Sequence, residues 1–171
     1  MKGILARIIS TGALLALVAA PLSAQGFMLG GGLTLHQNDY GDQVKDGWHG
    51  MVGLDLPLSG PLGLRVDGAY NLNAVDIPGD LDMDAALIAV SGDGVFQFGS
   101  GGVKPYVMGG VTWASLKCTG DDCIDTLSQS DVGYYIGGGL QFSSRFLEAR
   151  YVSITGDVQA DFVPITIGFH F

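Results

Sequence analysis

The sequence contains no run of about 20 apolar residues, the length that a membrane-spanning helix requires, although 47% of its 171 residues are hydrophobic. Apolar content this high without a helical period needs another place to be buried, and a lipid-facing sheet is one such place. The 28 glycines lie inside alternating segments, not in a flexible tract, which excludes a disordered low-complexity chain. The length fits a single domain.

Basic residues are scarce, with 8 Lys and Arg against 17 Asp and Glu. Two of them, Lys2 and Arg7, precede an apolar stretch over 8–20 and small residues before position 25, which is typical of a secretory signal peptide. An anchored helix is the alternative, but the stretch is short and interrupted at 10–12. We therefore expect a cleaved signal peptide over 1–24 and one domain over 25–171.

Without Lys2 and Arg7, 6 basic and 17 acidic residues give a net charge of −11, which argues against nucleic acid as a partner.

Cysteine is nearly absent: Cys118 and Cys123 are the only two, four residues apart. In a chain bound for an oxidising compartment, a disulfide is the default expectation for such a pair. Metal binding by the two cysteines is the weaker alternative, because structural zinc sites need four ligands.

Eight segments alternate between apolar and polar residues with the two-residue period of a β-strand. Most have about 10 or more residues, the length that a tilted strand needs to cross a bilayer. Short connections alternate with long ones, which is the pattern of periplasmic turns and external loops in outer-membrane barrels. The segments are 27–37, 47–57, 62–73, 84–98, 103–117, 132–142, 145–154 and 161–171.

One face of every segment is apolar, and we expect no charged residue on it. A soluble β-sandwich needs apolar residues inside and charge outside, whereas a barrel in lipid places the apolar face outward. Aromatic residues near both ends of the segments, such as Trp48 and Trp113 at one end and Phe142 and Phe169 at the other, predict two interfacial girdles. The opposite face carries seven charged residues: Asp55, Arg65, Asp67, Asp93, Lys104, Glu148 and Arg150.

Several short motifs, in their order and spacing, resemble a known family. They are KPYVMGGV at 104–111, GGGL at 137–140, LEARY at 147–151 and the aromatic Phe171. The chain resembles the small outer-membrane β-barrels that include the OmpA and OmpX transmembrane domains and the opacity-type surface antigens. The resemblance implies an all-β fold, an eight-stranded antiparallel transmembrane barrel with up-and-down meander topology in the bacterial outer membrane. It also implies that the outer-membrane assembly machinery reads Phe171 as a signal.

An eight-stranded barrel is only wide enough for its own side chains to fill. We expect the seven inward charges to form an ion-pair network that plugs the lumen, with Asp55 directly opposite Arg65 if Pro57 faces Gly63. Glu148 and Arg150 share one face of one strand. A narrow path for ions or solutes is the alternative interpretation.

The sequence shows no catalytic motif, and we expect neither enzymatic activity nor a cofactor. A lipid-modifying barrel needs a serine beside a histidine with a carboxylate to orient it, and no inward serine neighbours His170. His36 and His49 could share a metal with Asp46 near the outer mouth. The triple glycines at 30–32 and 137–139 are not phosphate loops, because neither a helix nor a lysine follows them.

The expected function is membrane integrity or surface presentation through four acidic external loops, with membrane lipid and lipopolysaccharide as partners. The alternatives are an adhesin or ligand-binding surface protein and a narrow porin-like channel. Four of the 17 acids lie in the strands, which leaves 13 in or beside the long connections.

Asp80, Asp82 and Asp84 place a carboxylate at every second residue of one connection, a set of hard oxygen ligands that suits calcium or magnesium. The glycine and distal glutamate of an EF-hand are absent, so a solvated anionic surface is the alternative. A bound divalent ion could bridge these carboxylates to lipopolysaccharide phosphates. Isothermal titration of the refolded protein with calcium is expected to give a saturable heat that Asp82→Asn weakens; no calcium heat would contradict the site.

Overall fold

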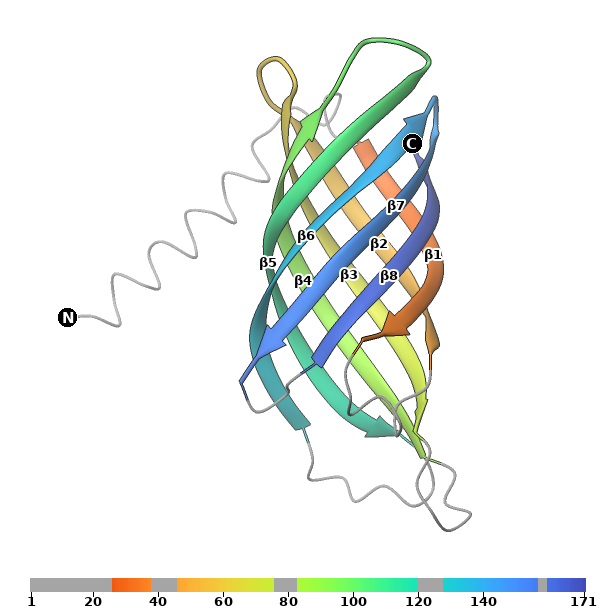
Figure 1. Ribbon diagram of the computed structural model, residues 1–171, viewed down its shortest axis with the longest axis vertical. Helices are drawn as coiled ribbons and strands as arrows, with labels where there is room; N and C mark the ends of the chain where they lie inside the picture. The colour runs from red at the N-terminus through yellow and green to blue at the C-terminus, as the bar shows by residue number, and fades with distance from the viewer. Residues whose placement is uncertain (1–25, 38–45, 76–82, 120–127, 157–159) are drawn as a thin grey trace, which may run out of the picture.

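The protein, as seen in a computed structural model, forms eight strands that close into a barrel (Figure 1). The structure describes residues 26–37, 46–75, 83–119, 128–156 and 160–171. Among these residues, no helix is long and apolar enough to cross a membrane. The strands are β1 (Gly26–His36), β2 (Gly47–Pro57), β3 (Leu62–Val75), β4 (Met83–Gln97), β5 (Val103–Thr119), β6 (Ser128–Phe142), β7 (Arg145–Thr155) and β8 (Ala160–His170).

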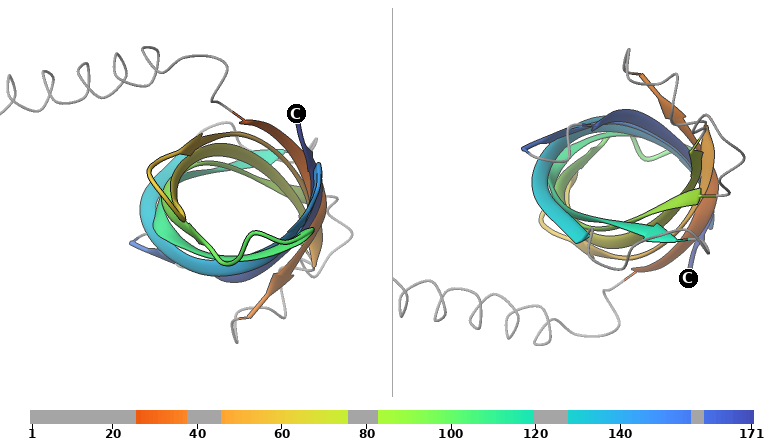
Figure 2. Two further views of the ribbon diagram at one scale, coloured as in Figure 1. Left: turned by 90° about the horizontal axis from the view of Figure 1, so that it is seen from above. Right: turned by 90° about the horizontal axis from the view of Figure 1, so that it is seen from below.

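Each strand pairs antiparallel with the next, and β8 pairs with β1 to complete the ring seen end-on in Figure 2. The predicted eight-stranded meander is therefore confirmed. The largest difference in bounds is at β6, which begins at Ser128 instead of residue 132. Its pairing with β5 continues to Lys117↔Ser128 because backbone hydrogen bonds do not depend on the polarity of the side chains.

The two ends of the barrel differ. The short connections after β2, β4 and β6 lie at one end together with both barrel termini, and we call this the turn end (top in Figure 1). There the backbone N–H of Phe171 donates to the carbonyl of Phe27, at 2.9 Å, which ties the last residue to β1. The opposite end, where the long connections begin, is the loop end.

The outer surface is apolar as predicted, with exposed side chains such as Leu33, Val111, Ile136 and Ile167. The girdle aromatics are exposed on the same surface, among them Trp48 and Tyr134 toward the loop end and Phe142 and Phe169 toward the turn end.

Among the side chains that the structure describes, the expectation that no charge falls on this surface is wrong at two positions. Arg145 and Asp161 share the outward alternation of Leu147 and Val163, and both lie at the start of a strand. A strand start lies at the level of the lipid headgroups and not in the hydrocarbon, where a charged side chain is tolerated.

The interior holds large side chains as well as charges. Met28, Met51 and Phe146 form one buried cluster, and Tyr106, Met108 and Tyr135 belong to a second. The Phe146 ring lies against Gly30 and Gly168, where a side chain would occupy the place of the ring. Glycine at these positions therefore lets a phenylalanine fill a narrow barrel.

Gly168→Ala tests this packing. A Cβ at position 168 would overlap both the Phe146 ring and the Leu29 carbonyl. We expect a loss of about 1–3 kcal/mol in the free energy of unfolding, the usual cost of overpacking. Gly94→Ala is the matched control, because a Cβ there meets no atom within 4 Å. Urea unfolding in lipid vesicles measures both variants, and equal stabilities would contradict the packing role of Gly168.

Candidate functional site

The turn-end half of the lumen gathers the charged residues through the register of the strands. Arg65 on β3 lies directly opposite Asp55 on β2, as predicted, and directly opposite Asp93 on β4. Across the ring, Glu148 and Arg150 on β7 are paired with Gly139 and Gly137 on β6. The glycines bring no side chains of their own, so two long charged side chains have room to enter the lumen.

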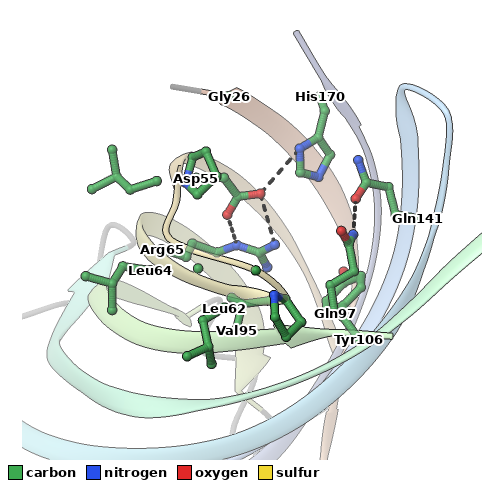
Figure 3. Close-up of a pocket in the computed structure, with 15 residues that line it drawn as sticks. Gly26, Asp55, Leu62, Leu64, Arg65, Val95, Gln97, Tyr106, Gln141 and His170 are labelled. Atoms are coloured by element: carbon green, nitrogen blue, oxygen red, sulfur yellow. Dashed lines mark hydrogen bonds and ion pairs between the residues drawn. The ribbon is translucent and has the colours of Figure 1, made fainter. Parts of the chain in front are cut away.

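Arg65 joins two sides of the barrel. Its Nε donates to Oδ1 of Asp55 at 2.6 Å, and its Nη1 donates to Oε2 of Glu148 at 2.5 Å. Because β3 and β7 stand four strands apart in a ring of eight, the second hydrogen bond spans the lumen. Figure 3 shows the Arg65 guanidinium directed at the Asp55 carboxylate.

Arg150 extends the network from the other side. Its Nε donates to Oε1 of Glu148 at 2.5 Å, and its Nη1 donates to Oδ2 of Asp67 at 2.9 Å. Glu148 therefore lies between two guanidinium groups. Four members of this chain of ion pairs are buried, and Asp55, with a side chain 25% exposed, is the member nearest to solvent.

Two tyrosines that were not predicted from the sequence, Tyr106 and Tyr135, complete the network. The Tyr106 hydroxyl donates to Oε2 of Glu148 at 2.8 Å, and the Tyr135 hydroxyl donates to Asp93. The rings also lie beneath the cations: Cζ of Arg65 is 5.5 Å from the Tyr106 centroid, and Cζ of Arg150 is 5.1 Å from that of Tyr135. The alternation of β5 could have identified Tyr106 as a lumen residue, because it follows Lys104 by two residues and shares its inward face.

Lys104 does not join the network. Within the described part of the chain it has no ion-pair or hydrogen-bond partner, and it lines a cavity at the turn end with Gln141 and Ser143. It is the second residue of β5 and therefore lies above the layer of ion pairs. His170, which was not predicted to join the network, lies at its edge, with Nδ1 3.3 Å from Oδ2 of Asp55.

The histidines near the loop end do not form the suggested metal site. Both ring nitrogens of His49 face hydroxyl groups, Nδ1 at 3.0 Å from Thr34 Oγ1 and Nε2 at 2.8 Å from Thr166 Oγ1. Asp46 accepts a hydrogen bond from the backbone N–H of His36 at 3.1 Å. In the described ranges, no three His, Cys, Asp or Glu side chains are grouped to hold a metal ion.

Other predicted residues lie outside the described part of the chain. They are the signal peptide over 1–24, Asp80, Asp82 and Cys123, together with the side chains of Asp84 and Cys118, whose backbone belongs to β4 and β5. The disulfide and the divalent-cation site stay predictions. Phe171 is described and exposed beside Phe27, with ring centroids 6.0 Å apart, and its role as an assembly signal also stays a prediction.

The ion pairs separate two cavities. The larger, about 400 Å³, lies at the turn end over Asp55, Arg65 and Tyr106 (Figure 3). The smaller, about 40 Å³, lies on the other side of the network, where Asp67 and Arg150 contribute to its walls. The network thus forms a layer between the two cavities.

Comparison with known proteins identifies the family of the chain and relates its fold to solved structures. The family model described as outer membrane protein beta-barrel domain matches residues 9–171, and no curated protein matches the chain. Neisserial surface protein A (NspA) is 15% identical, with a TM-score of 0.68 over 86% of this chain and 96% of that one. Ail, the attachment invasion locus protein of Yersinia pestis, is 18% identical, with a TM-score of 0.57 over 86% and 97%.

The outer membrane enzyme PagL also matches, at 16% identity and a TM-score of 0.53 over 86% of this chain and 99% of that one. At such identities the likeness to solved structures concerns the fold alone, because surface loops and sites can differ completely on one barrel.

Arg150→Ala tests the network. Removing Arg150 leaves the buried Asp67 without its cation and Glu148 with Arg65 as its one remaining guanidinium, and we expect a loss of about 3–5 kcal/mol in the free energy of unfolding. Lys104→Ala removes an unpaired cation from the same lumen and is expected to change stability by less than about 0.5 kcal/mol. Urea unfolding in phosphatidylcholine vesicles compares the two; equal midpoints would show that Arg150 is not held by a buried network.

Proposed function

The chain belongs to the outer membrane protein β-barrel domain family, and from that premise we propose that it is a non-enzymatic barrel whose lumen is plugged. It lies in the bacterial outer membrane, surrounded by membrane lipid and lipopolysaccharide. Short turns face the periplasm in such barrels, so the turn end is the periplasmic end and the loop end faces outward. Its role is membrane integrity or surface presentation through the external loops.

The observation that carries this proposal is the layer of ion pairs across the lumen. Arg65 reaches from β3 to Glu148 on β7, and Arg150 fixes Glu148 from the second side. Tyr106 and Tyr135 fill the space beside the guanidinium groups. A hydrated ion could pass only if these buried pairs separated, and breaking them is costly in a low-dielectric interior.

A surface role fits the distribution of charge. The sequence has 13 acids in or beside the long connections, which predicts a strongly negative outward end. Ail is an attachment invasion locus protein, and one of its structures contains a heparin analogue, sucrose octasulfate. Acidic loops repel such a polyanion, so an adhesin role for this chain requires a cationic partner or one bridged by divalent ions.

The absence of catalysis is part of the proposal, because PagL shows that a barrel of this size can be an enzyme. In the described residues, no histidine is hydrogen-bonded to a serine: His49 faces Thr34 and Thr166, and His170 faces Asp55. A serine hydrolase requires that contact to activate its nucleophile.

Single-channel recording in a planar bilayer tests the plugged lumen. We expect the refolded protein to be electrically silent, with heat-modifiable electrophoretic mobility showing that it folded. Glu148→Ala should introduce conductance, because it removes the acid between the two guanidinium groups. Stable conductance of the wild-type protein that changes with Arg65→Ala would make the lumen a channel and overturn the proposal.

A further inference from the structure

Two basic side chains, Lys104 and Arg145, lie near the tight turn between β6 and β7. Lys104 lies on the lumen side of β5 opposite Gln141, and Arg145 begins β7 opposite Phe142. Among the residues that the structure describes, neither side chain makes an ion pair or a hydrogen bond. Lys104 is on the lumen face and Arg145 on the lipid face, two strand spacings of about 5 Å apart, so the two cations flank the end of the barrel wall at this turn.

Hydroxyl groups lie between the two cations. Ser143 and Ser144 form the turn itself, both are exposed, and Ser143 borders a cavity of about 280 Å³ together with Lys104 and Gln141. Ser143 has a φ of 55°, and within the described residues it is the one residue other than glycine with a positive φ. Glycine, asparagine or aspartate is the usual residue at such a turn position, and residues held in sparsely populated backbone conformations cluster at functional sites.

Apolar side chains flank Arg145 on the lipid side. Phe142 on β6 and Phe169 on β8 are its direct neighbours in the sheet, and they are 40% and 48% exposed. Val103, opposite Phe142, is exposed as well. The guanidinium therefore projects from an apolar surface at the level of the aromatic girdle, where phospholipid headgroups meet the hydrocarbon.

We propose that the rim site, formed by Lys104, Ser143, Ser144 and Arg145, binds the phosphate of an anionic phospholipid in the periplasmic leaflet. The planar guanidinium of Arg145 suits two phosphate oxygens at once, and the Lys104 ammonium supplies a second positive charge. The acyl chains lie against Phe142 and Phe169. A free phosphate ion would find the same donors but would gain nothing from the exposed rings, which is why a lipid is the occupant.

The experiment uses nanodiscs with equal amounts of phosphatidylglycerol and phosphatidylcholine that carry identical acyl chains. The processed protein is extracted into mild detergent, and the lipids that stay bound are counted by native mass spectrometry. We expect phosphatidylglycerol to be enriched over phosphatidylcholine, and Arg145→Gln and Lys104→Gln each to lower that enrichment about fivefold, the usual effect of one cation at an anionic membrane surface.

Lys117→Gln is the matched control, because it removes one cation from the opposite end of the same strand, β5. It should leave the enrichment unchanged. Heat-modifiable mobility establishes that every variant is folded. Arg145→Lys keeps the charge but loses the contact to two phosphate oxygens, and it should retain more of the enrichment than Arg145→Gln and less than the wild type. A second arm adds inorganic phosphate at matched ionic strength and should displace little of the lipid.

Each contrary result overturns the proposal. Wild-type protein without phosphatidylglycerol enrichment, or enrichment that survives both Arg145→Gln and Lys104→Gln, would show that the rim does not bind this lipid. If Lys117→Gln lowered the enrichment equally, the enrichment would depend on the net charge of the protein and not on the rim site. Saturable binding of inorganic phosphate that needs Arg145 and Lys104, without lipid enrichment, would assign the site to a free ion.

Discussion

A sheet in lipid has to close, because no water is present to satisfy the N–H and C=O groups of an open edge. The pairing of β8 with β1 meets this requirement and fixes nearly everything else in the molecule. With eight strands the ring is just wide enough for its own side chains to fill, and the inward side chains pack against one another. It also divides each strand into a lipid face and a lumen face. Inward charges must then find their partners inside the ring.

Glu148 shows how the chain meets that second requirement. One carboxylate accepts hydrogen bonds from Arg65, Arg150 and Tyr106, which come from three different strands. Gly137 leaves open the space beside the Arg150 side chain, and Gly139 leaves room for the Tyr106 ring, whose hydroxyl reaches Glu148. The acids exceed the arginines in this layer, and Asp93 is held by the Tyr135 hydroxyl without a direct cation contact. Electrostatic satisfaction and packing are therefore achieved by the same side chains.

Strand positions, faces and hairpin registers could be predicted from the sequence because lipid enforces strict alternation, and a tight turn such as that before Arg145 fixes the pairing. Alternation shows whether a side chain faces the lipid or the lumen. It does not show the position of the side chain along the barrel axis or its partner across the ring. Lys104 was therefore placed in the network although it lies above it. The same limit hid the Arg65–Glu148 pair, which joins residues 83 apart in the chain. Tyr106 was not predicted because the alternation pattern does not distinguish an inward aromatic residue from any other apolar residue of a strand.

The reach of Arg65 across the ring has a consequence for how the barrel can assemble. When β1–β4 alone are paired, Arg65 has Asp55 on β2 but not Glu148, and Asp67 lacks Arg150, because β7 has not yet joined the sheet. Sequential insertion of hairpins into lipid would expose these charges to hydrocarbon at every intermediate stage. The order of events is thereby constrained: the sheet must stay in a wet or proteinaceous environment until β7 has joined. The ion pairs across the lumen therefore favour insertion of a barrel that is already closed over insertion of one hairpin at a time.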